Sequence, residues 1–106
     1  MPFVTLEREG NIALITMNRP EALNALNRQV LEELNQVLDQ VEADPEIYVA
    51  ILTGAGRSFV AGADIGQMST LTSAEAKAFG LFGNQVFLKL ENLTKPTIAA
   101  VNGFAL

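Results

Sequence analysis

YVAILTGAGRSFVAGADI, residues 48–65, is the stretch that decides the fold and the candidate site of this chain. Tyr48-Val-Ala-Ile-Leu-Thr53 is an apolar, β-rich run, and Gly54 and Gly56 release the chain from that predicted strand. Ala61-Gly62-Ala63 then offers main-chain N–H groups with almost no side chain over them. A segment of this kind can bind an oxyanion or a phosphate.

The residues before this stretch predict a β-hairpin and then a helix. Residues 3–8 and 12–17 form two strands joined by a turn at 9–11, and the second strand, apolar on both faces, predicts a sheet covered on both sides. Pro20 breaks that strand. A helix is expected from an N-cap near Asn24 to the Asp44-Pro45 break, because apolar residues recur at helical spacing. This stripe consists of Val30, Leu31, Leu34, Val37, Leu38 and Val41.

The residues after the stretch predict a second helix and another strand. Thr72-Ser-Ala-Glu75 has the pattern of a capping box, and the apolar stripe that follows is Phe79, Phe82, Val86, Leu90 and Leu93. Residues 94–96 stop this helix, 97–101 form a short strand, and Asn102-Gly103 turns the chain into Phe104-Ala105-Leu106. Strands separated by helices imply right-handed parallel crossovers, so the predicted class is α/β.

Composition and charge exclude several functions. The chain has 106 residues, a net charge of −5 and only seven Lys and Arg, which argues against nucleic acid and anionic membranes as partners. It contains no cysteine and no histidine, so triads built on these residues and zinc sites of the usual ligands are excluded. No metal site is expected, and carboxylates, amides and backbone groups are left to do any chemistry.

Length and hydropathy suggest a protein of the cytoplasm. A chain of 106 residues, 49% hydrophobic and 18% charged, is one domain at most or part of a larger one. Its first residues, Met1-Pro-Phe-Val-Thr-Leu-Glu-Arg-Glu, predict an acidic strand without the pattern of a signal peptide. No run approaches the roughly 18 apolar residues of a membrane span. We therefore expect a cytoplasmic protein.

Three separated blocks give the chain a family resemblance. They are residues 18–26 (NRPEALNAL), 58–65 (SFVAGADI) and 95–106 (KPTIAAVNGFAL). In this order and spacing they resemble the amino-terminal portion of the enoyl-CoA hydratase/isomerase (crotonase) family. The resemblance implies that 1–106 are the amino-terminal part of one crotonase-like domain, a partial ββα repeat fold with no second domain.

The resemblance also implies a substrate and a chemistry. Enzymes of this family act on acyl-CoA and stabilise an enolate with N–H donors, so coenzyme A is part of the substrate and no separate cofactor is needed. The Ala63 N–H would be one donor of the oxyanion hole, and the full-length form would be a trimer or hexamer. The residues expected to line the bound acyl-CoA are Ala22, Leu23, Ala25, Ala61, Gly62, Ala63, Asp64, Ile65 and Gly66.

Several of these residues also have plainer interpretations. The 61–63 segment alone could be a tight loop packed on the sheet, and Asp64 could be a general base or, more simply, the cap of a short helix at 65–68. Arg19 could pair with a CoA phosphate or be only a surface charge, while Glu21 fits a solvated turn. A dinucleotide-binding loop at Gly54-Ala-Gly56 is disfavoured because Phe59 stands at the third glycine position.

Other interpretations concern the aromatic residues and two departures from the family pattern. Phe79, Phe82 and Phe87 could form an acyl pocket, but core packing is the better interpretation. Relatives often carry a lysine where this chain has Gly66, and a smaller residue where it has Val60. The lysine would be a charge contact for the CoA phosphates, and its replacement puts such a contact at this position in doubt.

Three hypotheses for the function follow. In the first, the chain is the acyl-CoA-binding part of an enoyl-CoA hydratase-like lyase, with the second oxyanion donor and the catalytic carboxylates expected beyond Leu106, so that the chain alone is inactive. In the second, the complete protein runs another reaction of the family, as an isomerase, decarboxylase or thioester hydrolase. In the third, the chain is a non-catalytic half-domain that serves in assembly.

Overall fold

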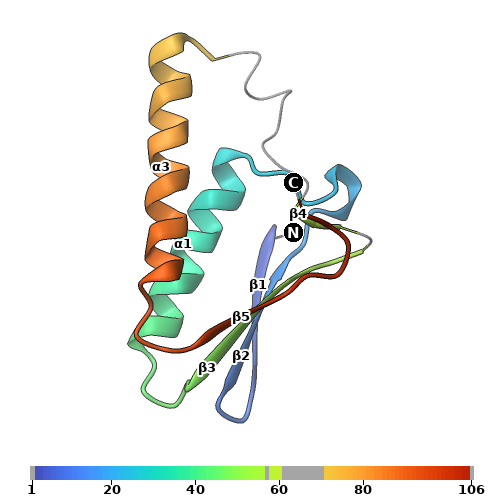
Figure 1. Ribbon diagram of the computed structural model, residues 1–106, viewed down its shortest axis with the longest axis vertical. Helices are drawn as coiled ribbons and strands as arrows, with labels where there is room; N and C mark the ends of the chain where they lie inside the picture. Colours follow the sequence, from blue (N-terminus) through green and yellow to red (C-terminus); the bar gives the residue numbers. More distant parts are fainter. Residues whose placement is uncertain (1, 57, 61–70, 106) are drawn as a thin grey trace.

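The fold is a mixed four-stranded sheet with two long helices (Figure 1). This computed structural model describes residues 2–56, 58–60 and 71–105. In chain order the elements are β1 (Val4–Glu9), β2 (Ile12–Met17), the 3-10 helix η1 (Pro20–Ala22), α1 (Arg28–Ala43), β3 (Val49–Gly54), β4 (Ser58–Val60), α3 (Ser73–Glu91), β5 (Thr97–Ala100) and β6 (Phe104–Ala105).

The main sheet has the strand order β1-β2-β3-β5. β1 and β2 pair antiparallel, and the pairing of Glu9 with Ile12 leaves only Gly10 and Asn11 in the turn. Gly10 has a φ of 60°, which a glycine adopts without steric cost. β2 pairs parallel with β3, and β3 with β5, each pair connected through a helix. The predicted α/β class, a hairpin followed by parallel strands with crossover helices, is confirmed.

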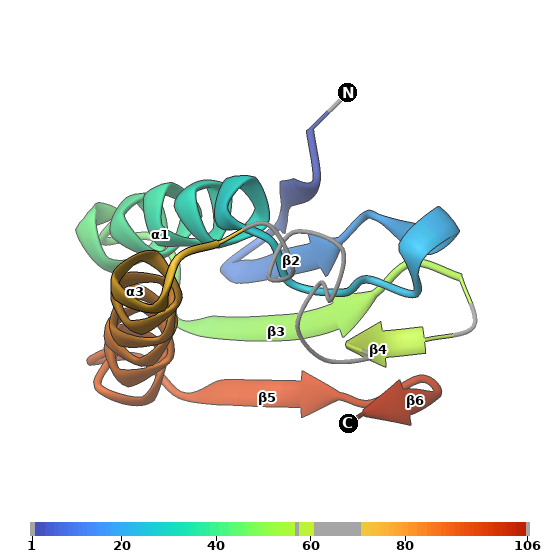
Figure 2. The ribbon, with the colours of Figure 1, turned by 90° about the horizontal axis from the view of Figure 1, so that it is seen from above.

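A second, two-stranded sheet lies at the end of β3. β4 and β6 pair parallel, with Ser58 opposite Phe104 and Val60 opposite Ala105. Figure 2 shows this pair beside the ends of β3 and β5, set off from the main sheet. The sequence did not predict this pairing, because strands of three and two residues carry no recognisable periodicity.

Helix α1 covers one face of the sheet, and α3 packs chiefly against α1 (Figures 1 and 2). On β2 the side chains of Ala13, Ile15 and Met17 are buried under the helices, while Ile12 on the opposite face is 43% exposed. The expectation of a sheet covered on both faces is therefore not met by the described residues. The buried apolar core consists of Val4, Ala13, Ile15, Met17, Val30, Leu31, Leu34, Val37, Leu38, Val41, Ile47, Ala50, Leu52, Phe79 and Val86.

Helix α1 begins three residues later than predicted. Its N-cap is Asn27, whose side-chain oxygen accepts from the Val30 N–H at 2.8 Å. Asn24 instead has a left-handed backbone with a φ of 58°, and its side chain is engaged elsewhere. Both asparagines suit a cap, and tertiary hydrogen bonds decide which one serves. The predicted apolar stripe from Val30 to Val41 is buried as expected.

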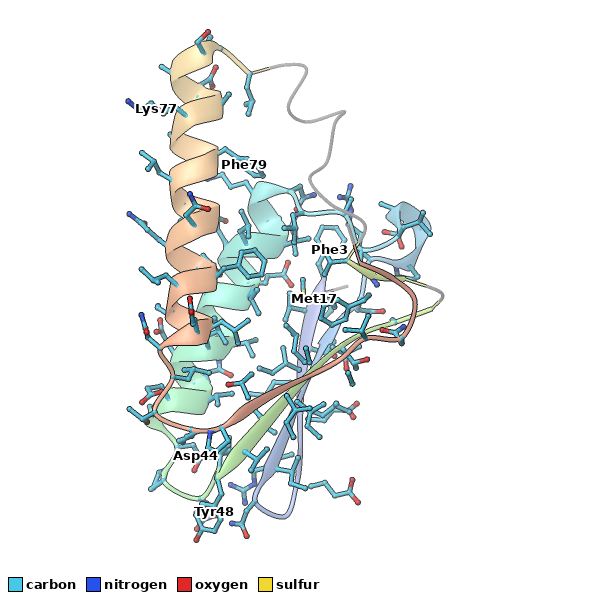
Figure 3. The ribbon with its side chains drawn as sticks, viewed as in Figure 1. Phe3, Met17, Asp44, Tyr48, Lys77 and Phe79 are labelled. Carbon is cyan, nitrogen blue, oxygen red and sulfur yellow. The ribbon has the colours of Figure 1, made fainter. Side chains whose placement is uncertain are left out.

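Helix α3 starts with the predicted capping box. The Thr72 hydroxyl accepts from the Glu75 N–H at 3.1 Å, and the Glu75 carboxylate accepts from the Thr72 N–H at 3.0 Å. The helix ends at the C-cap Asn92, so Leu93 lies beyond it. Phe79 is buried and faces α1 (Figure 3), and Phe82 and Phe87 pack against the core. The core-packing interpretation is confirmed for Phe79 and Phe82, whereas Phe87 packs against the core and also lines an apolar cavity beside β4.

The carboxyl ends of the two helices are tied together by polar contacts. Lys89 Nζ lies 2.7 Å from an Asp39 carboxylate oxygen, and the Lys95 ammonium donates to the carbonyls of Val41 and Asp44 at the end of α1. A cation at this end of a helix also complements its dipole. The Glu42 carboxylate accepts from both the hydroxyl and the N–H of Thr94.

Replacing Glu42 with glutamine tests this contact through pH. The two hydrogen bonds from Thr94, and then the charge of Lys95, lower the pKa of the Glu42 carboxyl from its ordinary 4.5, although desolvation opposes them. A lowered folded pKa stabilises the fold above the unfolded pKa, and this stability is lost as the pH falls through the folded value. We expect Glu42→Gln to be less stable than the wild type at pH 7, with the difference shrinking below pH 4.5 as the pH falls towards the lowered folded pKa, measured by urea unfolding. A constant difference at all pH values would contradict the assignment.

Candidate functional site

The candidate site begins where the chain leaves β3, at Gly54-Ala55-Gly56, which we call the exit turn. The Ala55 N–H continues the parallel pairing by donating to the Met17 carbonyl at 2.7 Å. Gly56 then adopts a φ of 82°, and a Cβ built on it would lie 3.1 Å from Cβ of Pro20. The exit turn therefore packs directly against the start of η1, and glycine is needed there for both reasons.

The segment that packs on the exit turn is residues 19–25. Its backbone reverses through the left-handed residues Leu23 and Asn24. Asn24 is only 1% exposed: its side-chain oxygen accepts from the Arg19 N–H at 2.7 Å, and its amide group donates to the Ala55 carbonyl at 3.0 Å. One buried carboxamide thus closes the segment on itself and joins it to the exit turn.

Arg19 has a structural role in the same segment. Its guanidinium donates to the Ala25 carbonyl at 3.1 Å and lies over the ring of Phe3, 5.5 Å from the centroid. The interpretation of Arg19 as only a surface charge is therefore wrong, because the side chain is half-buried and bonded to its own segment. Pairing with a CoA phosphate stays a prediction.

Asn102 contacts the other side of the exit turn, from the segment after β5. Its side-chain oxygen accepts from the Gly54 N–H at 3.0 Å, and its amide group donates to the carbonyls of Gly54 at 2.7 Å and Gly56 at 3.0 Å. The Thr53 hydroxyl lies 3.3 Å from the same side-chain oxygen. The donors and acceptors of the backbone fix which way this carboxamide points.

The structure places part of the predicted site. Ala22, Leu23 and Ala25 are half-buried in the segment beside the exit turn, and Glu21 is exposed, as a turn residue should be. The other predicted residues lie outside the part of the chain that the structure describes, as does the short helix expected at 65–68. These are Ala61, Gly62, Ala63, Asp64, Ile65 and Gly66.

An apolar cavity of about 320 Å³ lies beside β4. Met17, Leu34 and Leu52 line it from the core, Phe59 and Val60 from β4, and Phe87 from α3, with Leu26 completing the wall. Its volume falls at the lower end of the range for small-molecule pockets. The cavity therefore lies next to the residues that immediately precede Ala61.

The described residues also bear on metal sites and on membrane-spanning helices. In the ranges 2–56, 58–60 and 71–105 there is no group of three or more Asp, Glu, His or Cys side chains that could hold a metal ion. Among the helices that the structure describes, none has the length and apolar character needed to cross a bilayer.

Sequence reasoning missed the roles of Asn24 and Asn102. The sequence alone predicts a helix cap at Asn24 and a turn at Asn102, since both positions suit asparagine for local reasons. Both residues lie within the blocks that carry the family resemblance, at positions 18–26 and 95–106. That shared location was a usable signal, although it did not say that both side chains reach the same turn.

Comparison with known proteins identifies the family. The model of the enoyl-CoA hydratase/isomerase family matches residues 7–106, and the chain belongs to this family. It is 56% identical over 104 residues to a short-chain-enoyl-CoA hydratase of Clostridium acetobutylicum, covering 97% of this chain and 40% of that protein. It is 48% identical to a crotonyl-CoA hydratase of Syntrophomonas wolfei, with the same coverage. The chain thus spans about 40% of the length of these relatives.

Solved structures confirm that the chain has part of the crotonase fold. An enoyl-CoA hydratase from Bacillus anthracis superposes with a TM-score of 0.92 at 30% identity, covering 95% of this chain and 40% of that one. An enoyl-CoA hydratase/carnithine racemase from Magnetospirillum magneticum gives 0.90 at 38% identity, covering 95% and 39%. The arrangement of hairpin, parallel strands and helices is therefore that of known family members.

Proposed function

We propose that residues 1–106 are the acyl-CoA-binding part of a crotonase-like domain in an enoyl-CoA hydratase-like lyase. The whole protein would add water reversibly to a 2-enoyl-CoA. The Ala63 N–H would be one oxyanion-hole donor, with Ala61 to Gly66 and the segment at Ala22, Leu23 and Ala25 lining the bound acyl-CoA. Coenzyme A belongs to the substrate, so no further cofactor is required.

The chemistry explains why backbone donors matter. When water adds, its oxygen bonds to C3 of the enoyl group and the C2=C3 electron pair moves towards the thioester, giving an enolate whose charge rests on the thioester oxygen. One proton of the water passes to a base, one of the carboxylates expected beyond Leu106, and a proton is delivered to C2, which completes the hydration without a redox partner. Donors already aimed at that oxygen stabilise the enolate, and removing one typically costs about 10² to 10³ in kcat.

The convergence of residues 19–25 on the exit turn carries this proposal. The Asn24 amide group lies 3.0 Å from the Ala55 carbonyl, so the segment proposed to shape the CoA pocket is fixed beside the start of the proposed oxyanion loop. The identity of 56% to a protein named as a short-chain-enoyl-CoA hydratase supports the same reaction. The apolar cavity beside β4 suits a short acyl chain.

We also propose that the whole protein is a homo-oligomer, a trimer or hexamer as in the family.

Binding of crotonyl-CoA tests the proposal. Titration calorimetry of the chain is expected to give saturable binding. Ala63→Pro removes the N–H and is expected to weaken this binding about tenfold. That loss is equivalent to about 1.4 kcal/mol, the contribution of one hydrogen bond. Ala63→Gly keeps the N–H and should bind like the wild type. Ser73→Pro is the matched control, since position N1 of a helix accepts proline.

The outcomes separate the hydratase hypothesis from the other two. No binding by the wild-type chain, or equal binding by Ala63→Pro and Ala63→Gly, would overturn the proposed site. Hydration of crotonyl-CoA by the whole protein, followed as loss of the enoyl-thioester absorbance, is expected to fall about 10² to 10³-fold in Ala63→Pro. Binding without hydration would overturn the hydratase assignment and favour another reaction of the family or a non-catalytic module.

A further inference from the structure

We propose that Asn24 and Asn102 are a pair of positioning residues that hold the exit turn of β3 from its two sides. The inference rests on the proposed function, and it adds two side chains whose hydrogen bonds reach the backbone beside the proposed oxyanion loop. Both act through the backbone of residues 54–56. They come from segments 78 residues apart in the sequence, one before α1 and one after β5.

Asn24 holds the turn from the side of η1. Its carboxamide accepts from Arg19 and donates to the Ala55 carbonyl, while Pro20 contacts the position that a Cβ of Gly56 would fill. A buried carboxamide with these partners is costly to disturb, because each group left unpaired loses its hydrogen bond without regaining water.

Asn102 holds the same turn from the side of β5. Three hydrogen bonds join its carboxamide to the backbone of Gly54 and Gly56, and both N–H groups of the amide are used. Two residues further on, β6 pairs with β4. The segment after β5 therefore fixes both the exit turn and the strand that follows it.

The two contacts together determine the path of the chain out of β3. Asn24 forms a hydrogen bond with Ala55, and Asn102 forms hydrogen bonds with Gly54 and Gly56. Every residue of the exit turn therefore has a side-chain partner. β4 follows after Arg57, and Val60 lies three positions before the proposed donor Ala63. Since a displacement of about 1 Å can cost about 10²-fold in rate, a turn fixed on both sides is suited to a preorganised donor.

Asparagine-to-aspartate variants test the pair in the whole protein with crotonyl-CoA. Asn24→Asp and Asn102→Asp keep an acceptor oxygen but place a carboxylate against backbone carbonyls. We expect kcat per folded enzyme to fall about 10 to 100-fold with KM changed less than about threefold, because the donor acts on the enolate more than on the bound substrate. Asn84→Asp, an exposed position on α3, makes the same charge change and should leave both constants unaltered.

The double variant shows whether the two residues act together. Because both hold one turn, its loss of kcat should be smaller than the product of the single losses. This inference would be overturned if the loss of kcat in the double variant equalled the product of the two single losses. It would also be overturned if kcat were unchanged in variants of a protein that hydrates crotonyl-CoA. Either result would leave the proposed function standing. Absence of hydration by the wild type would overturn the proposed function instead. If Asn24→Asp does not fold, Asn102→Asp, at an exposed residue, decides the result.

Discussion

Leu38→Ala is expected to lower the free energy of unfolding by about 2 to 5 kcal/mol, the range for truncating a buried leucine. Leu38 is fully buried on the face of α1 that belongs to the core cluster. The loss combines the transfer of the removed carbons with the cavity that they leave. Urea unfolding of the purified protein, monitored by circular dichroism, measures this difference in free energy when the dependence on urea concentration (the m-value) is the same for both proteins.

Leu88→Ala is the matched control for that prediction. Leu88 is also a helical leucine, but 55% of its surface is exposed, so we expect a change within about 0.5 kcal/mol. A similar destabilisation in both variants would mean that helix propensity or the unfolded state, rather than burial, determines the cost. It would contradict a core that lies between α1 and the sheet.

Gly56→Ala is expected to destabilise the protein by about 2 to 3 kcal/mol. An alanine at a φ of 82° costs about 1 to 2 kcal/mol, and its Cβ would lie 3.1 Å from Cβ of Pro20, which forces the two segments apart. The same variant should weaken crotonyl-CoA binding, because the exit turn moves. Thermal unfolding and calorimetry give the two effects separately.

Gly10→Ala separates the two causes of that loss. Gly10 also has a positive φ, of 60°, but no atom lies within 4 Å of the Cβ that an alanine would add. We expect only the conformational cost of about 1 to 2 kcal/mol, and normal crotonyl-CoA binding. Equal losses of stability in the two variants would argue against the close packing of the exit turn on η1.

Most of the fold was predictable because local patterns and tertiary structure agree. The stripe from Val30 to Val41, the capping box at Thr72 and Glu75, and the turn at Gly10 each indicate one structure, and the chain adopts it. The start of α1 was misplaced because Asn24 and Asn27 are equally good caps in isolation. The partners of the Asn24 side chain, the Arg19 N–H and the distant Ala55 carbonyl, distinguish them.

The candidate site was predictable in its sequence blocks and much less so in its contacts. Small residues at 61–63 and the blocks around them suggested where an acyl-CoA would bind. Asn102 could be assigned to the exit turn only once β5 was placed beside β3, because its hydrogen bonds span 46 to 48 residues. Pairings of such long range depend on topology and leave no local pattern.

The uneven support of α3 has a consequence for its motions. Contacts through Lys89, Thr94 and Lys95 fix the end near Glu91, whereas Phe79 is the first buried residue at the other end and Lys77 points away from the molecule (Figure 3). Among the residues that the structure describes, the first turns therefore depend mainly on their capping box. The free energy of local opening should decrease from Glu91 towards Ser73, so that α3 unwinds from its amino end while the rest of the fold stays intact.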